Sequence, residues 1–289
     1  MIVNKLNWVS IKKASPVLLK ELDAKMSEFY SSFEKRNNYQ KLVDGTHENP
    51  DPNSRLAKDI AVYIAEQGMK SVVEVGCGSG KIYNHLLGTS FSGSYTGIEM
   101  ASYVIEANQR NYPNANWKVG SVYDLSDQPD QYDCCIAFFV LEHLIYPDRA
   151  LAAMLHAVKQ GGTIILVFPD FACSGIIPSQ KIGLHPGAGA KDKLTKGRII
   201  DAFISYFEGM MMRSALKNIN KEYGNFVINT SPYCLDKDCG TLVPDMDAIY
   251  IGNKKEVENW ARENNCSVQY PMGVDGAMHR IAFMCIKKN

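Results

Sequence analysis

The residues Glu74-Val75-Gly76-Cys77-Gly78-Ser79-Gly80 carry the clearest structural signal in this chain. They continue a short β-branched run that begins at Ser71, and the residues after Gly80 have helical character. A strand, a glycine-rich turn and a helix in this order form a binding arrangement, because glycines let a ligand approach the backbone and the helix N-terminus offers free N–H groups. The alternative interpretation is a tight strand-to-helix connection without a ligand.

Strand-like and helix-like segments alternate around this turn. Further strands are predicted at residues 95–99, 115–120, 133–139 and 163–168, and helices at residues 81–87, 103–110 and 149–158. This alternation predicts parallel strands joined by right-handed crossovers, with helices on both faces of the sheet. The run 133–139 is almost continuously apolar, as expected for a strand buried on both faces. A helix at 254–264 and strands at 267–270 and 280–286 complete the pattern.

Two segments lie outside this alternation. Residues 1–53 form a predicted N-terminal helical extension, with apolar residues at helical spacing from Leu18 to Phe33. Residues 170–245 separate the fifth strand from the closing helix, and a structureless loop of that length is improbable in a compact domain. We therefore expect one domain over residues 54–289, with a cap inserted at about 170–245.

Length and composition indicate a folded chain without a strong electrostatic preference. The 289 residues are 46% apolar and 21% charged, which excludes a disordered chain. Lys and Arg together number 31, as do Asp and Glu, so no general attraction to nucleic acid or to an anionic membrane is expected. No apolar run approaches the ~20 residues that span a bilayer. Residues 1–13 are polar, so no signal peptide is expected either.

The cysteines indicate a reducing compartment. Eight of them are scattered along the chain without a Cys-x-x-Cys pair, and several lie in apolar strand-like runs. We interpret them as reduced, mostly buried thiols of a cytoplasmic protein. Cys234 and Cys239 do not have a standard zinc-ligand spacing, so no metal site is expected.

Two acids accompany the glycine turn. Glu74 precedes it, and Glu99 ends the next predicted strand, 19 residues after Gly80. A carboxylate at that position can accept hydrogen bonds from ribose hydroxyls. The nicotinamide-binding pattern Gly-x-Gly-x-x-Gly would need a glycine where the chain has Lys81. A nicotinamide-dependent oxidoreductase is therefore disfavoured.

Together with two later segments, these residues resemble class I methyltransferases that depend on S-adenosyl-L-methionine (SAM). Residues 132–144, which end in Leu141-Glu142-His143-Leu144, resemble the fourth-strand motif of ubiquinone/menaquinone-type and related small-molecule methyltransferases. Residues 158–167 resemble the motif that follows it, and the resemblance as a whole covers roughly residues 55–170. It implies an α/β fold with a Rossmann-like, doubly wound sheet of seven mostly parallel strands, the last of which is antiparallel.

The resemblance also implies SAM as the cofactor and gives roles to the residues of the turn. Gly76, Cys77 and Gly78 would pass under the amino-acid part of SAM, and Gly80 belongs to the same cofactor-binding turn. Glu74 would help to order this turn.

Further implied roles concern the ribose, the adenine and the methionine end of SAM. Glu99 would hold both ribose hydroxyls, and Met100 would pack on the adenine. The family often has an acid after the third strand that bonds the adenine amino group, and Ser121 stands at that place here. The backbone of Val122 would still contact the adenine, and Phe138 would meet the methionine end of the cofactor.

Catalysis requires an acceptor atom in line with the methyl–sulfur bond, in a site that excludes water. An acceptor hydroxyl would benefit from a nearby base, and the candidates are His143 and His185. His143 follows Glu142 at a predicted helix start, and His185 lies in the inserted cap. Each of the two histidines also has a purely structural interpretation.

We therefore predict a SAM-dependent methyltransferase that acts on a small molecule, with oxygen favoured as the acceptor atom and a saccharide or natural product as the acceptor type. The alternatives are an RNA or protein methyltransferase and a non-catalytic module that binds SAM. Tyr233, Asp245 and Asp247 either contact a polar substrate or shape turns. The apolar face of residues 198–216 packs on the core, forms a lid over the substrate or serves as the seam of a homodimer.

Overall fold

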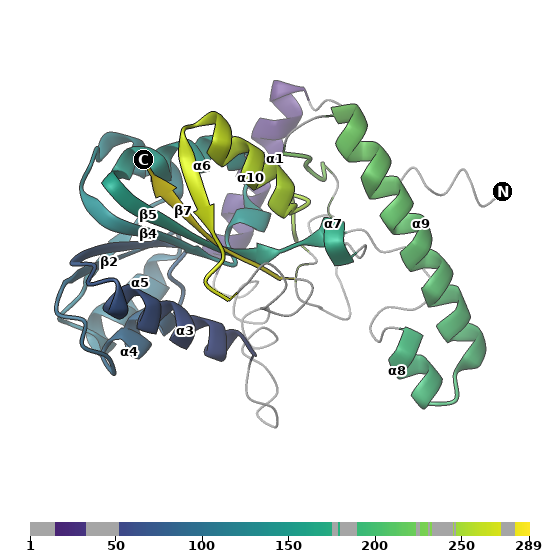
Figure 1. Ribbon diagram of the computed structural model, residues 1–289, viewed down its shortest axis with the longest axis horizontal. Helices are drawn as coiled ribbons and strands as arrows, with labels where there is room; N and C mark the ends of the chain where they lie inside the picture. The colour runs from purple at the N-terminus through teal and green to yellow at the C-terminus, as the bar shows by residue number, and fades with distance from the viewer. Residues whose placement is uncertain are drawn as a thin grey trace.

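The computed structural model describes residues 15–32, 52–174, 179, 190–223, 226–230, 232, 245, 247–272 and 281–289. Its strands are β1 (Ser71–Val75), β2 (Ser94–Glu99), β3 (Asn116–Val119), β4 (Tyr132–Phe138), β5 (Val158–Pro169), β6 (Cys266–Gln269) and β7 (Ile281–Lys288). They form one sheet with the order β3-β2-β1-β4-β5-β7-β6 (Figure 1). The first five strands are mutually parallel, and β7 runs antiparallel to both of its neighbours. The predicted doubly wound sheet with an antiparallel last strand is confirmed.

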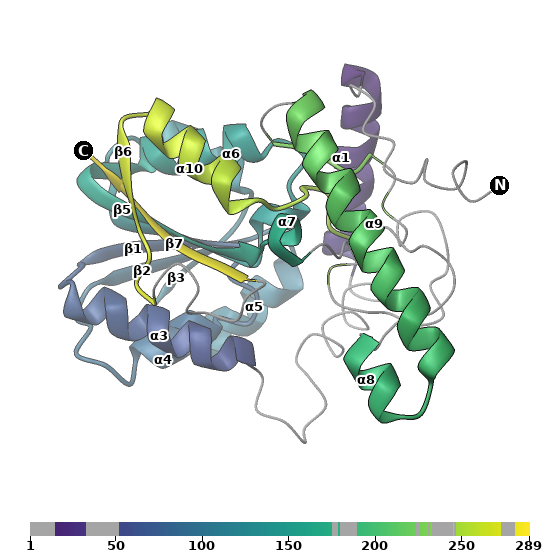
Figure 2. The same cartoon turned by 45° about the vertical axis from the view of Figure 1, so that its right-hand side comes forward.

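Helices cover both faces of this sheet (Figures 1 and 2). One face carries α3 (Pro52–Glu66), α4 (Lys81–Leu86) and α5 (Ser102–Asn111), and the other carries η2 (Val122–Asp127), α6 (Pro147–Ala157) and α10 (Lys254–Glu263). The short 3-10 helix η3 (Leu141–His143) follows β4. The central strand β4 supplies Cys135 to one apolar core and Cys134 to the other, which explains its continuous apolar run. Among the described helices, none combines the length and the apolarity needed to cross a membrane.

Strand β5 is longer than its sequence pattern predicted. The expected strand covered residues 163–168, whereas the observed strand begins at Val158. Tyr132 on β4 pairs with Val158, and the register shifts before Cys134 pairs with Thr163. The glycine-containing residues 160–162 therefore lie in β5 at this irregularity, between the two paired positions, although their sequence indicates a turn.

The N-terminal part of the chain contributes helix α1 (Pro16–Ser31). Leu22 and Met26 on this helix are buried against Ile145, which follows η3, and Ile249, which precedes α10. Helix α1 therefore packs on two segments that lie more than a hundred residues from it in sequence.

The inserted segment contributes α7 (Phe171–Ser174), α8 (Ala190–Thr195) and α9 (Ile199–Tyr223), which lie to one side of the sheet (Figures 1 and 2). The exposed side chains of the predicted apolar face are Ile199, Ile200, Phe203, Phe207 and Met210. The prediction that this face packs on the core is therefore wrong for these five residues. A lid over the substrate and a homodimer seam stay predictions.

Candidate cofactor and acceptor site

The glycine turn between β1 and α4 has a left-handed backbone conformation. The φ angles of Gly76, Gly78 and Gly80 are +63°, +48° and +74°. A Cβ atom on Gly76 would lie 2.4 Å from Val140 Cγ2, and one on Gly80 would lie 2.8 Å from Trp117 Cη2. A Cβ atom on Gly78 would meet nothing within 4 Å. Gly76 and Gly80 therefore pack tightly on the protein, while the space over Gly78 is open to a ligand.

Glu99, the last residue of β2, ties this turn to the neighbouring strand. Its buried carboxylate accepts hydrogen bonds from the backbone N–H groups of Gly78 (3.2 Å), Met100 (2.8 Å) and Ala101 (3.3 Å). Asn108 Nδ2 donates to the carbonyl oxygen of Gly78 at 2.7 Å. The carboxylate and the amide hold the turn at the carboxyl edge of the sheet, which is where ligands of open parallel sheets bind.

Glu74 lies on β1, inside the sheet, two residues before the turn. Its side chain is 2% exposed and accepts a hydrogen bond from the hydroxyl of Tyr95 on β2. Burial raises the pKa of Glu74 to about 8, although the bond from Tyr95 opposes part of this rise. The carboxyl group is therefore mostly protonated at neutral pH. Because the bond runs to β2, any effect of Glu74 on the turn is indirect.

Ser121 caps the start of η2. Its hydroxyl accepts a hydrogen bond from the N–H of Tyr123 at 3.4 Å, and its own N–H donates to Asp124 Oδ2 at 2.7 Å. These reciprocal bonds form a capping box. Asp124 was not predicted, although the spacing of Ser121 and Asp124 in the sequence is the signal for such a cap. The predicted neighbour Val122 is buried at the first position of η2.

Three further predicted cofactor residues lie at the same edge of the sheet. Cys77 is buried within the turn, and Met100 follows Glu99 with 37% of its surface exposed. Phe138 ends β4 and packs edge-on against Phe139, with ring centroids 4.8 Å apart. The carboxyl ends of three neighbouring parallel strands, β1, β2 and β4, therefore bring these residues together.

A second group of polar side chains follows β4. His143 on η3 has its Nδ1 atom 3.2 Å from Asp247 Oδ2 and its Nε2 atom 3.8 Å from Glu142 Oε1. The hydroxyl of Tyr30 on α1 donates to Asp247. Ligand atoms of Glu142, His143 and Asp245 lie within 4.8 Å of one another. We call these five residues, Tyr30, Glu142, His143, Asp245 and Asp247, the acid–histidine cluster.

The groups of the acid–histidine cluster shift one another's titration. Burial by itself lowers the pKa of His143, but the neighbouring carboxylates, that of Asp247 foremost, raise it to about 9. Burial raises the pKa of Glu142 to about 8 and that of Asp245 to about 6. Burial acts on Asp247 in the same direction, but His143 and Tyr30 hold its pKa below the usual range. In this arrangement His143 is protonated at neutral pH, so it is not a free base.

The acid–histidine cluster joins residues that the sequence left apart. His143 was predicted as a catalytic candidate, and Asp245 and Asp247 were predicted separately as substrate contacts or turn residues. Tyr30 was assigned only to an apolar helix face, and no local pattern marks its bond to a residue 217 positions away. His185 and Tyr233 lie outside the described residues.

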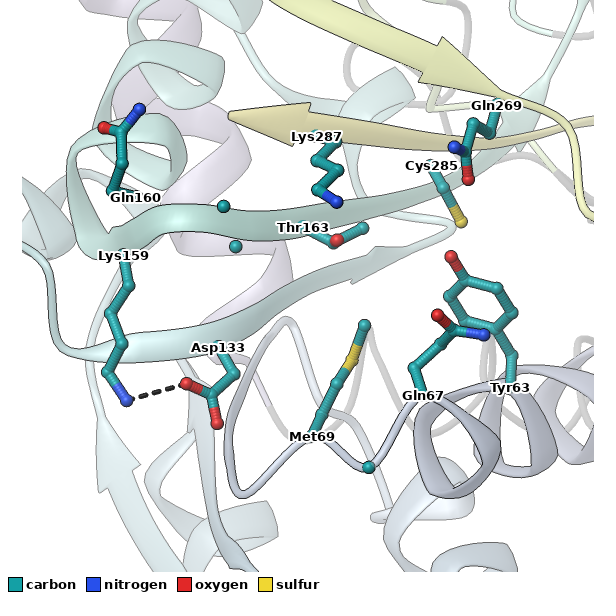
Figure 3. A pocket seen from close by; sticks show the side chains of 13 residues that line it. Tyr63, Gln67, Met69, Asp133, Lys159, Gln160, Thr163, Gln269, Cys285 and Lys287 are labelled. Carbon is teal, nitrogen blue, oxygen red and sulfur yellow. Dashed lines mark hydrogen bonds and ion pairs between the residues drawn. The ribbon is translucent and has the colours of Figure 1, made fainter. Parts of the chain in front are cut away.

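A cavity of about 380 Å³ lies at the opposite edge of the sheet (Figure 3). Asp133 and Lys159 line it and form an ion pair, with 2.7 Å between Lys159 Nζ and Asp133 Oδ1. Asp133 Oδ2 also accepts hydrogen bonds from the N–H groups of Lys70 and Ser71. These groups join the amino ends of strands, whereas cofactors of such sheets bind at the carboxyl ends. This cavity is therefore not the cofactor site.

Residues 73–166 match a protein family described as a methyltransferase domain. The match begins in β1, contains the glycine turn, Glu99 and η3, and ends in β5. The chain contains a class I SAM-dependent methyltransferase domain. The resemblance of the motifs to this class is thereby confirmed.

Curated relatives share this methyltransferase domain over part of their length. The mitochondrial ubiquinone biosynthesis O-methyltransferase of Candida albicans is 26% identical over 132 residues, which cover 43% of this chain and 39% of the relative. Protein 235L of Invertebrate iridescent virus 6, which is named as a methyltransferase, is 28% identical over 98 residues, which cover 34% of this chain and 37% of the relative. The matched part of the chain thus spans under two-fifths of the length of these relatives.

A solved methyltransferase structure has a similar fold. Magnesium protoporphyrin IX methyltransferase from Synechocystis PCC 6803, with bound S-adenosyl-L-homocysteine (SAH), aligns with a TM-score of 0.52 and 12% sequence identity. The alignment covers 91% of this chain and 98% of that chain. This likeness supports the methyltransferase type of Rossmann-like fold.

The glycine turn fits the cofactor of this domain class, which is SAM. The turn leaves open space over the backbone of Gly78. The buried carboxylate of Glu99 stands beside that space at the end of β2. An open backbone and a fixed acceptor are the two features that a nucleoside with an amino-acid tail requires at this edge of a sheet.

Proposed function

We propose that this chain transfers the methyl group of SAM to an oxygen atom of a small molecule. The observation that carries the proposal is the open, left-handed glycine turn bound to the Glu99 carboxylate. The name of the Candida albicans relative, a ubiquinone biosynthesis O-methyltransferase, supports oxygen as the acceptor atom. The balance of 31 basic and 31 acidic residues supports a small molecule over RNA.

In this proposal the turn and the adjacent strand ends hold the cofactor. The backbone of the glycine turn lies under the amino-acid part, and Glu99 accepts hydrogen bonds from the ribose hydroxyls. Met100 and Val122 contact the adenine, and Phe138 covers the methionine end. SAM supplies a methyl group that its sulfonium already activates. The remaining tasks of the protein are to align the acceptor and to exclude water.

We place the acceptor between the glycine turn and the acid–histidine cluster. Val140 packs against Gly76, so the segment that leads into η3 lies directly against the turn. His143 on η3 is the residue that we propose to contact the acceptor. His185, the second histidine predicted for catalysis, belongs to the cap and stays a prediction. Saccharides and other hydroxylated natural products suit the polar character of this cluster.

The cysteines bear on where this reaction would take place. Cys134, Cys135, Cys266 and Cys285 are free thiols, and all four are buried. Free thiols are typical of reducing compartments, and we propose the cytoplasm as the location.

Isothermal titration of the purified chain with SAM, SAH and NAD tests the cofactor part of the proposal. We expect both adenosyl ligands to bind and NAD not to bind. A screen with labelled SAM against saccharides and other hydroxylated compounds, with RNA and protein as comparison substrates, then tests the reaction. If neither adenosyl ligand binds, the proposed function is wrong. Binding without transfer to any substrate would favour the non-catalytic module.

A further inference from the structure

We propose that Glu142, His143 and Asp245 bind a divalent cation of the first transition series, Mn²⁺ or Zn²⁺. The sequence pattern indicated no metal site, because the three ligands come from segments about a hundred residues apart. The fold brings them together directly after β4.

The spacing of the donor atoms suits a single ion. One ligand atom from each of the three residues lies within 4.8 Å of the others, and His143 Nε2 lies 3.8 Å from Glu142 Oε1. Ligands that sit about 2.1 Å from a common ion are roughly 3–4 Å apart, depending on the coordination angle. A small inward movement of the side chains would therefore complete the coordination.

Among the described residues, the carboxylate of Glu142 accepts no hydrogen bond, and its ion pair with His143 is long, at 3.8 Å. The side chain of Glu142 is fully buried. A buried carboxylate without hydrogen bonds is costly unless it is neutralised or coordinates a metal. The backbone carbonyl of Glu142, which accepts from Ile249 and Tyr250, holds the residue in place independently of the carboxylate.

Asp247 and Tyr30 orient the histidine for metal binding. Asp247 lies 3.2 Å from Nδ1 of His143, and this directs Nε2 towards Glu142. The hydroxyl of Tyr30 donates to the same oxygen of Asp247, Oδ2. Carboxylate–histidine–metal arrangements of this kind select the tautomer of the ligating histidine and raise its basicity. Asp247 and Tyr30 are therefore positioning residues for the ligand His143.

Charge and donor type define the class of ion. Cation binding would release the protons that Glu142 and His143 hold at neutral pH, and the resulting two carboxylates and neutral imidazole balance the charge of a divalent cation. A mixed set of oxygen and nitrogen donors suits Mn²⁺ or Zn²⁺ better than Mg²⁺, which prefers oxygen and water. Three protein ligands leave coordination positions for water or for an acceptor oxygen, so with the cation bound His143 would meet the acceptor through the ion. This last role rests on the proposed function, whereas cation binding does not.

Titration with MnCl₂, followed by the electron paramagnetic resonance signal of free Mn²⁺, tests the proposal on the whole 289-residue chain. We expect one Mn²⁺ per chain, displaced by ZnCl₂. The variants Glu142→Gln and Asp245→Asn should each weaken Mn²⁺ binding at least about tenfold. Asp247→Asn should weaken it about 10–100-fold, because Asp247 positions the ligand His143. Glu263→Gln, which removes an exposed acid on α10, is the control and should bind as the parent does.

Two results would overturn the cation site. One is a parent chain that binds neither Mn²⁺ nor Zn²⁺ at millimolar concentration, and the other is binding that persists unchanged in both ligand variants. If Glu142→Gln does not fold, Asp245→Asn decides, because Asp245 is only partly buried. SAM titration of the same samples separates the two proposals: loss of Mn²⁺ binding with intact SAM binding concerns the cation alone, and the reverse concerns the cofactor alone.

Discussion

Glu99 is the side chain on which the cofactor proposal depends most. Replacement by alanine removes a carboxylate that accepts three backbone hydrogen bonds and, in our proposal, the ribose hydroxyls. We expect Glu99→Ala to weaken SAM binding by ~1–3 kcal/mol, as measured by isothermal titration. Glu106→Gln, which changes an exposed acid on α5, is the matched control. An unchanged affinity in Glu99→Ala would mean that the proposed position of the cofactor is wrong.

Substitutions of Gly78 and Gly80 can show which glycine faces the ligand and which packs against the protein. Both have positive φ angles, so alanine at either position costs about 1 kcal/mol of stability. At Gly80 the added Cβ atom also meets Trp117 at 2.8 Å, whereas at Gly78 it points into open space.

We therefore expect Gly80→Ala to lose more stability than Gly78→Ala in urea unfolding. We also expect Gly78→Ala to bind SAM at least about tenfold more weakly, which corresponds to about 1.4 kcal/mol. The two variants control for each other. A Gly78→Ala variant with normal SAM affinity would place the cofactor elsewhere.

The raised pKa of Glu74 leads us to expect that the free energy of unfolding depends on pH. Its pKa is raised from 4.5 to about 8 in the folded protein, so the folded chain holds this proton more tightly than the unfolded chain does. The stability contributed by this group is fully present below about pH 4.5 and is lost as the pH rises through about 8.

Glu74→Gln keeps a neutral side chain and should escape this loss. One pKa unit corresponds to about 1.4 kcal/mol, so between about pH 5 and pH 9 the variant should gain a few kcal/mol relative to the parent. Urea unfolding of both proteins across this range measures the gain. Parallel stability curves would show that burial does not raise the pKa of Glu74.

Helices α8 and α9 belong to the segment that is predicted to form the cap. Neither of the two apolar cores that cover the sheet includes a described residue from 190–223. We expect replacement of residues 190–223 by a short Gly-Ser linker to preserve SAM binding but to abolish methyl transfer. Isothermal titration and the labelled-methyl assay measure the two properties. Full transfer activity in the shortened chain would show that these helices do not cap the acceptor.

Most elements follow from local sequence, but two do not. Helix α4 was predicted at 81–87 and spans Lys81–Leu86, because the glycine turn marks its start and an apolar face marks its length. Strand β5 instead begins at Val158, which pairs with Tyr132 on β4, and residues 159–162 lie at the irregularity before the next pair. Helix α9 continues to Tyr223, beyond the predicted end at 216. The limits of β5 depend on its pairing with β4, and the local periodicity of the sequence does not predict these limits.

In the molecule as a whole, the sheet topology gathers the candidate site. The strands β2, β1 and β4 are neighbours and run in the same direction. Their carboxyl ends therefore place Glu99, the glycine turn and η3 at one edge. The sequence predicts this convergence, because each motif follows a predicted parallel strand. The cofactor-binding side of the site could therefore be proposed from the sequence alone.

The acid–histidine cluster shows what the amino-acid pattern does not contain. The fold and the ligand of residues 74–99 can be predicted from sequence, because strand, turn and helix signals depend on neighbours a few positions away. The approach of Tyr30 and Asp247, which are 217 positions apart, depends on the packing of α1 against the chain before α10. Side-chain contacts at such separations result from the shape complementarity of the whole core, and no period or spacing in the sequence encodes them.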